Sequence, residues 1–133
     1  MAHLLFIYGT LSQTDNPVAH LLQNRLRYLF KGKIKGVLYD TGDYPGLIPD
    51  DKGNWVYGSI CELDDDALAI IDDYEGYGEN QEQPNLYLRL MSAVQTESSI
   101  ISAWIYVYNR SVDGFEKIQS GNYQEYLQQK KSP

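Results

Sequence analysis

Apolar and β-branched residues gather in short runs along the chain, and polar or glycine-containing turns separate the runs. Runs of this length, rich in valine, isoleucine and aromatic residues, are typical of β-strands. They predict strands over residues 4–8, 31–40, 55–63, 86–94 and 100–108, with a shorter extended piece at 46–49. Only Gln95 to Ser99 separate the last two long runs, so we expect those strands to form an antiparallel pair.

Two other segments carry apolar residues at helical spacing. The first begins at Asn16-Pro17, a good cap and first-turn pair, and its leucines predict a helix over residues 17 to about 28. The second begins after Asp64, which is placed to cap it, and ends near Asp73. Its predicted apolar stripe comprises Leu68, Ile71 and Tyr74.

The order of these elements predicts the fold class. About six strands and two helices, with a further helical turn near Tyr123, indicate an α+β protein whose sheet curls toward a barrel. The chain shows no internal repeat, low-complexity tract or linker. We therefore expect one domain over residues 1–133.

Composition and charge narrow the classes of partner. Hydrophobic residues make up 43% of the chain and charged residues 22%, as in globular proteins. The net charge of −7 argues against a nucleic-acid partner, and the lysines at 31, 33 and 35 are assigned to a solvated strand face or a guarded edge. No apolar run approaches the roughly 20 residues that span a bilayer, so no membrane partner is expected.

The single cysteine and the first residues bear on the compartment. Cys61 cannot form an internal disulfide, and the start of the chain lacks the basic and cleavage regions of a signal peptide. We expect a cytoplasmic protein in which Cys61 is a buried thiol on a strand. The oligomeric state is left open.

The usual signatures of metal and cofactor sites do not occur in the sequence. His3 and His20 stand in unrelated contexts, the lone cysteine adds no ligand pair, and the run Asp64 to Asp66 suits a helix start. Gly9 lacks the further glycines of a dinucleotide loop, and neither a phosphate-loop lysine nor a G-x-S-x-G serine is found. We expect no metal and no cofactor, which leaves acid–base chemistry by a carboxylate.

Glu75 is the candidate carboxylate. It lies at a predicted helix end, after Asp72 and Asp73 and before Gly76. The negative end of a helix and acidic neighbours both raise the pKa of a carboxyl, as a general base that later returns its proton requires. The alternative is that Glu75 is a solvated surface residue.

Gly9 and Thr10 end the first predicted strand. A strand that stops at a glycine can offer main-chain amides to a carboxylate or an oxyanion. The alternative is an ordinary turn.

Five short segments combine into a wider resemblance. In chain order they are Tyr8-Gly9-Thr10-Leu11, residues 36–40 with 44–47, Val56 to Leu63, Leu68 to Gly76, and Tyr87-Leu88-Arg89. Together they resemble the motifs of the gamma-glutamylcyclotransferase-like family, and the end of the chain is similar to that of its small bacterial members. The resemblance implies a mixed α+β barrel and an internal acyl transfer without cofactor.

The resemblance also implies roles for individual residues. In such enzymes the α-amine of a γ-glutamyl group attacks its own γ-carbonyl, giving 5-oxoproline and a free amine. Glu75 would carry the proton from the ammonium group to the departing nitrogen. The expected substrate contacts are the amides of Gly9, Thr10 and Leu11, the ring of Tyr8, and the hydroxyls of Tyr87 and Tyr123. The acidic loop from Gly76 to Pro84 is longer than in many relatives, and would either act as a lid or displace Glu75 from the pocket.

Three functions from different classes remain open on this sequence. The first is a cyclotransferase acting on a γ-glutamyl amine or a small γ-glutamyl peptide. The second is a non-catalytic module that binds a small anionic metabolite in the same pocket. The third is protein association through tyrosine-rich surfaces, which a large exposed apolar patch would favour.

Overall fold

The structure is a computed structural model that describes residues 2–9, 22, 24–42 and 44–131. Nine elements follow one another along these residues: β1 (His3–Ile7), β2 (Arg27–Asp40), β3 (Pro45–Pro49), β4 (Asn54–Leu63), α2 (Asp65–Glu75), β5 (Tyr87–Thr96), β6 (Ile100–Tyr108), β7 (Glu116–Lys117) and α3 (Tyr123–Lys131).

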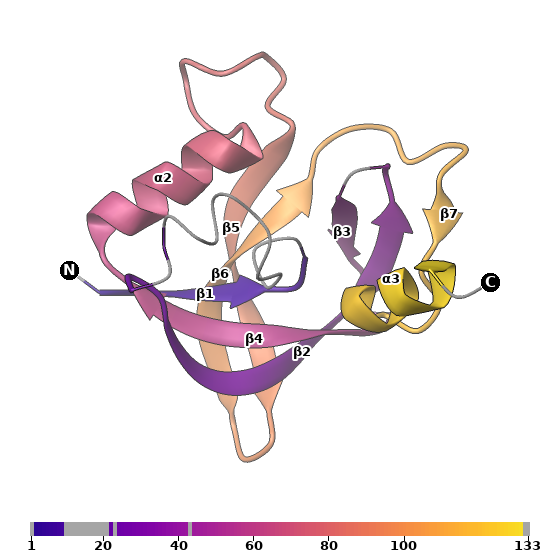
Figure 1. Cartoon of the computed structure of the whole chain (residues 1–133), viewed down its shortest axis with the longest axis horizontal. Helices are drawn as coiled ribbons and strands as arrows, with labels where there is room; N and C mark the ends of the chain where they lie inside the picture. Colours follow the sequence, from indigo (N-terminus) through magenta and orange to yellow (C-terminus); the bar gives the residue numbers. More distant parts are fainter. Residues whose placement is uncertain (1, 10–21, 23, 43, 132–133) are drawn as a thin grey trace.

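Five of the strands close into a barrel (Figure 1). Their order is β2, β4, β1, β6 and β5, and β5 pairs back to β2 at Gly32 and Lys33. All neighbouring pairs are antiparallel except β1 and β6, which run parallel. β3 and β7 add to the later half of β2. The predicted α+β class with a mixed β-barrel is confirmed.

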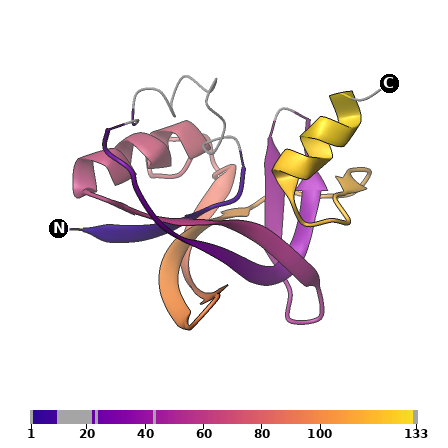
Figure 2. The same cartoon turned by 60° about the horizontal axis from the view of Figure 1, so that its bottom comes forward.

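The two described helices lie apart from each other (Figure 2). α2 lies over β1, and its buried residues Leu68 and Ile71 pack against the outer side of the sheet. α3 lies beside the end of β2, where the hydroxyl of Tyr126 donates to Oδ2 of Asp40 at 2.6 Å and Lys130 donates to the same oxygen at 3.0 Å. No helix among the described residues is long and apolar enough to cross a membrane.

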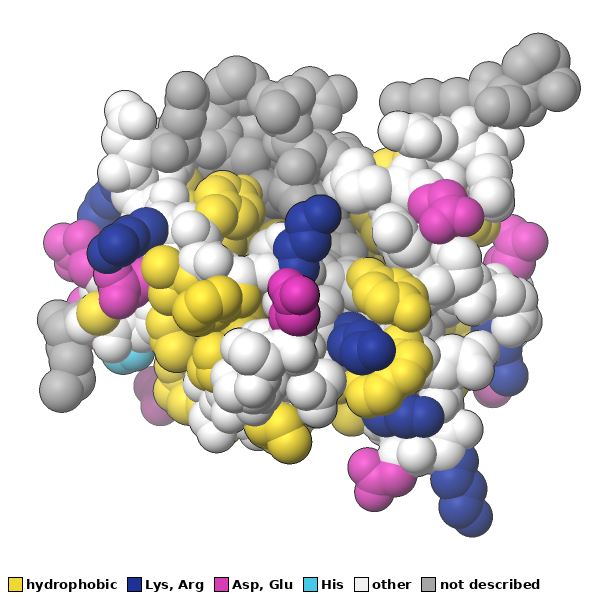
Figure 3. Space-filling view, turned by 90° about the horizontal axis from the view of Figure 1, so that it is seen from below, with side chains coloured by type: hydrophobic (Ala, Val, Ile, Leu, Met, Phe, Trp, Pro, Cys, Tyr) yellow, Lys and Arg dark blue, Asp and Glu magenta, His cyan; other side chains and the backbone are white. Residues whose placement is uncertain are grey.

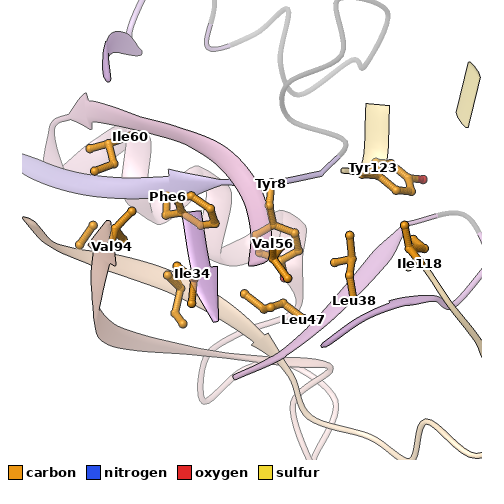
Figure 4. Close-up of a cluster of buried hydrophobic side chains, with 12 residues drawn as sticks. Phe6, Tyr8, Ile34, Leu38, Leu47, Val56, Ile60, Val94, Ile118 and Tyr123 are labelled. Carbon is orange, nitrogen blue, oxygen red and sulfur yellow. The ribbon is translucent and has the colours of Figure 1, made fainter. Parts of the chain in front are cut away.

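Alternation along β1 divides the buried side chains into two clusters. Phe6 and Tyr8 point toward the interior of the barrel, together with Ile34, Leu47 and Val56 (Figure 4). The intervening residues point to the side that α2 covers, because successive side chains of a strand face opposite ways. That second cluster includes Leu5, Ile7, Cys61, Leu68, Ile71, Tyr87 and Tyr106.

The structure changes several expectations at the ends of elements. Of the helix predicted over 17–28, residues 17–21 and 23 lie outside the described part, and Arg27 and Tyr28 belong to β2, where Tyr28 pairs with Cys61. α2 runs on to Glu75. Tyr74 is 38% exposed, so its place in the apolar stripe was wrong. The turn predicted near Tyr123 is the start of α3.

Cys61 is fully buried on β4, as predicted, and burial raises the pKa of its thiol to about 12. The lysines of β2 do more than face solvent. The ammonium groups of Lys33 and Lys35 lie 4.3 and 4.9 Å from the ring centre of Trp55, a cation–π arrangement. Figure 3 shows basic side chains beside apolar ones on this molecule's underside.

Candidate active site

A small cavity lies where β1 ends beneath the last turn of α2. Its volume is about 30 Å³, room for one or two water molecules. Its lining comes from five elements or their ends: Leu5, Phe6, Ile7, Tyr8, Gly9, Tyr44, Pro45, Glu75, Tyr87 and Tyr106. Four candidates from three separate sequence motifs therefore meet here, namely Tyr8, Gly9, Glu75 and Tyr87.

The other predicted contacts are not among these lining residues. Thr10 and Leu11 lie outside the described residues. Tyr123 is buried in the barrel cluster at the start of α3 and does not line this cavity. The expected contact of its hydroxyl with a substrate stays a prediction.

Local helix signals place Glu75 at the cavity. Asp64 caps the start of α2 by accepting a hydrogen bond from the Ala67 N–H at 2.8 Å. Gly76 ends the helix with φ 72° and ψ 35°, a left-handed conformation that suits glycine. The N–H of Tyr77 then donates to the Asp72 carbonyl at 2.9 Å, which closes the cap. Glu75 is thus the final helical residue, at the end that faces β1.

Gly9 lies in a position that no side chain could share. A Cβ at this residue would lie 2.7 Å from Cγ of Pro45 and 3.1 Å from Cδ. The absent side chain lets the end of β1 approach the start of β3 and leaves the cavity between them open.

Two buried tyrosines hold the cavity wall through main-chain carbonyls. The Tyr8 hydroxyl donates to the carbonyl of Tyr106, and the Tyr87 hydroxyl donates to that of Pro45, each at 2.5 Å. Burial, helped by the charge of Glu75, raises the pKa of both hydroxyls far above the ordinary value, so both stay protonated. The Tyr87 hydroxyl could donate a hydrogen bond to a substrate only after it had released the Pro45 carbonyl.

Glu75 is partly buried rather than a solvated surface residue. Burial is the largest cause that raises the pKa of its carboxyl, and the nearby charge of Asp72 is the second; together they raise it to about 8. The sequence had suggested Asp72 correctly, but it could not show burial. Asp73 is exposed and accepts a hydrogen bond from the Gln81 amide at 2.7 Å.

A network that the sequence did not reveal lies beside Glu75. Oδ1 of Asp72 accepts hydrogen bonds from Nε of Arg89 and from the Tyr106 hydroxyl, both at 2.8 Å. These partners come 17 and 34 residues later in the chain. The only available signal was the Y-x-R pattern that contains Arg89.

Two carboxylates of the acidic run at the start of α2 have partners within the protein. Asp64 caps α2, and Asp65 pairs with His3. Within the described part of the chain, no three histidine, cysteine, aspartate or glutamate side chains gather as a metal site would require.

Hydrogen bonds join the two ends of the loop after α2. Asn85 accepts from the Gly78 N–H at 3.1 Å and donates to the Gly78 carbonyl at 2.9 Å. The loop does not displace Glu75, which lines the cavity. Its role as a lid stays a prediction.

Comparisons with known proteins agree with this arrangement. A family model described as "Gamma-glutamyl cyclotransferase, AIG2-like" matches residues 5–125. The "Gamma-glutamylcyclotransferase family protein YtfP" of Escherichia coli K12 is 34% identical over 121 residues, covering 90% of this chain and 94% of that protein.

Two solved structures are also similar to this chain over most or all of its length. The solution structure of E. coli ytfP matches with a TM-score of 0.66 and 31% identity, over 93% of this chain and 98% of that one. The crystal structure of YkqA from Bacillus subtilis matches all of this chain with a TM-score of 0.78 and 29% identity. This chain spans 44% of YkqA, less than half of its length. The chain therefore belongs to the gamma-glutamyl cyclotransferase, AIG2-like family.

Proposed function

We propose that this protein is a γ-glutamyl cyclotransferase that converts a γ-glutamyl amine or a small γ-glutamyl peptide to 5-oxoproline and a free amine. The observation that carries the proposal is the cavity shared by Glu75 and the end of β1. In that cavity the pKa of Glu75 is raised to about 8, so the carboxyl can both accept and return a proton near neutral pH.

Two protons leave the substrate's α-nitrogen, and Glu75 carries them in turn. The ionised carboxylate takes one proton from the α-ammonium group, and the freed amine attacks the γ-carbonyl carbon. Protonated Glu75 gives this proton to the departing nitrogen, and the C–N bond to the leaving group breaks as the carbonyl forms again. The carboxylate then takes the extra proton from the lactam nitrogen and passes it to the released amine, which leaves as an ammonium ion. The five-membered lactam leaves and Glu75 is again ionised, so the substrate supplies all the atoms and electrons.

Positioning supplies much of the acceleration in this proposal. Since both reacting groups belong to one substrate, holding the glutamyl chain in a bent form could contribute about 7 kcal/mol. The backbone amides from Gly9 to Leu11 would hold the glutamyl group and its developing oxyanion, with Tyr8 and Tyr87 along the wall. A cavity of about 30 Å³ must widen to admit a glutamyl group, and release of the Tyr87 hydroxyl from Pro45 is one way to do so.

The buried, unpaired Cys61 fits a reducing compartment, so we place this activity in the cytoplasm as part of the same proposal.

Release of 5-oxoproline from a panel of γ-glutamyl amines and dipeptides tests the proposal. Wild type should turn over at least one substrate, and Glu75→Gln should fold but lose at least 100-fold in kcat. Glu79→Gln, an exposed change of the same kind in the loop after α2, is the matched control and should retain activity. Full activity in folded Glu75→Gln would remove the mechanism. No product from any substrate, with a thermal shift on ligand addition, would favour the binding module instead.

A further inference from the structure

The carboxylate of Asp72 is held more firmly than that of any other acidic residue near the cavity. Arg89 and Tyr106 both donate to its Oδ1 at 2.8 Å, and the side chains of Asp72 and Arg89 are only 19% and 18% exposed. Two such donors on one oxygen hold a partly buried carboxylate in one position.

Arg89 is itself fixed by two aromatic rings. Its guanidinium carbon lies 4.4 Å from the ring centre of Trp104 on β6 and 5.5 Å from that of Tyr77, in the loop after α2. Stacking of this kind holds a planar guanidinium in one orientation. The positive charge of Arg89 is therefore held on β5, next to the carboxylate of Asp72.

Asp72 and Glu75 lie on one face of α2. Residues three apart on a helix are neighbours, with Cβ atoms about 5–6 Å apart. The other titratable groups that line the cavity around Glu75 are tyrosines: Tyr8 from β1, Tyr44 before β3, Tyr87 from β5 and Tyr106 from β6. Burial raises the pKa of Tyr8, Tyr87 and Tyr106, so these hydroxyls are neutral. Among the described residues, Asp72 is the charged side chain that acts on Glu75, and Arg89 is paired with Asp72.

We propose that Asp72 and Arg89 form a fixed charge pair that sets how strongly Glu75 holds its proton, with Asp72 as the positioning residue and Arg89 as its moderator. The inference rests on the proposed function in naming Glu75 as the proton carrier. The negative charge of Asp72 makes Glu75 the stronger base, and the positive charge of Arg89 limits that effect. The two members act in opposite directions.

Single substitutions separate the two charges. Asp72→Asn keeps the shape and an acceptor oxygen but removes the negative charge, so the pKa of Glu75 should fall by about one unit. Arg89→Gln removes the positive charge and should raise that pKa by about half a unit, because the guanidinium is farther away. Arg89→Lys keeps the charge and should stay near wild type. Asp73→Asn, a change of the same kind at the adjacent exposed residue, is the matched control and should shift nothing.

Two readouts follow the same carboxyl. The first is the acid limb of kcat/KM against pH for the best γ-glutamyl substrate. The second is a ¹³C NMR titration of the Glu75 carboxyl without substrate, which also reports whether each variant is folded. Opposite shifts for Asp72→Asn and Arg89→Gln are expected in both. If either residue had only a structural role, its substitution would lower kcat/KM at every pH without changing the pKa of the acid limb.

The outcomes distinguish this inference from the proposed function. Opposite NMR shifts in a protein that turns over no substrate would support the charge pair and reject only the cyclotransferase. An active enzyme in which both variants shift the same way, or not at all, would overturn the charge pair and leave the activity standing. If Asp72→Asn does not fold, Arg89→Gln against Arg89→Lys decides, and equal titrations in those two would overturn it.

Discussion

Replacing Glu75 with glutamine should stabilise the protein at alkaline pH, although it removes the proposed catalytic group. In the folded protein the pKa of Glu75 is raised from its ordinary value of 4.5 to about 8, with burial as the main cause and Asp72 as the second. Between these two values the folded state binds more protons at Glu75 than the unfolded chain does. The free energy of unfolding therefore falls as pH rises from about 5 to 8, and is unaffected by Glu75 below the lower value.

The size of this effect follows from the shift. Three and a half pH units correspond to about 5 kcal/mol as an upper limit. Because Glu75 is partly exposed, solvent screens some of that cost, and about 2–3 kcal/mol is a reasonable expectation. Glutamine resembles the protonated acid in shape and cannot ionise. Glu75→Gln should match wild type near pH 4.5 and exceed it by that amount at pH 9.

Urea denaturation of both proteins from pH 4.5 to 9 measures the difference. Other titrating groups are common to the two chains, so the difference between the curves isolates Glu75. Glu79→Gln, which changes an exposed carboxylate, should follow wild type at every pH. Parallel curves for wild type and Glu75→Gln across the whole range would refute the reasoning, since they would mean that Glu75 ionises at little cost in the folded protein.

Three smaller perturbations test the frame around the cavity. Gly9→Ala would bring its methyl carbon to 2.7 Å from the Pro45 ring and should cost about 1–3 kcal/mol; a urea midpoint equal to wild type would show that the ring yields. Tyr87→Phe removes the buried hydrogen bond to the Pro45 carbonyl and should cost about 1–2 kcal/mol by the same assay, and an unchanged midpoint would contradict it. Asp64→Ala removes the cap bond from Ala67 and should lower stability by about 1 kcal/mol in thermal melts, whereas no loss would mean that the cap is dispensable.

Most of the strands could be predicted because each carries its own local signal. The runs near 55–63 and 100–108 are long, apolar and bounded by turns, and the structure places β4 and β6 there. The segment before residue 31 was harder. Its leucines fit helical spacing, but Tyr28 pairs with Cys61 on β4, and that distant partner decides the conformation of a short apolar segment.

The site was predictable only in part for the same reason. Glu75 stood out through its acidic neighbours and the glycine after it, which are local. Its burial depends on β1, β5 and β6, and the bond from Tyr8 to the Tyr106 carbonyl joins residues 98 apart. Pro45 lies in the family-like segment 44–47, but nothing in that segment points to Gly9, and Tyr106 lies in none of the five segments. The contact between Gly9 and Pro45 becomes meaningful only when β3 is placed against the end of β1.

The charges at the end of α2 are the reverse of what helix stability alone would favour. A helix C-terminus is stabilised by basic residues, yet the last turn of α2 has none and ends in Glu75 after Asp72 and Asp73. Arg89 supplies a cation from β5, but it pairs with Asp72, and none of the ion pairs found among the described residues includes Glu75. In the described part of the chain, the cation nearest this helix end thus neutralises Asp72, and the carboxyl of Glu75 stays costly to ionise. The proposed reaction needs that cost, because there Glu75 must take a proton and return it in each turnover.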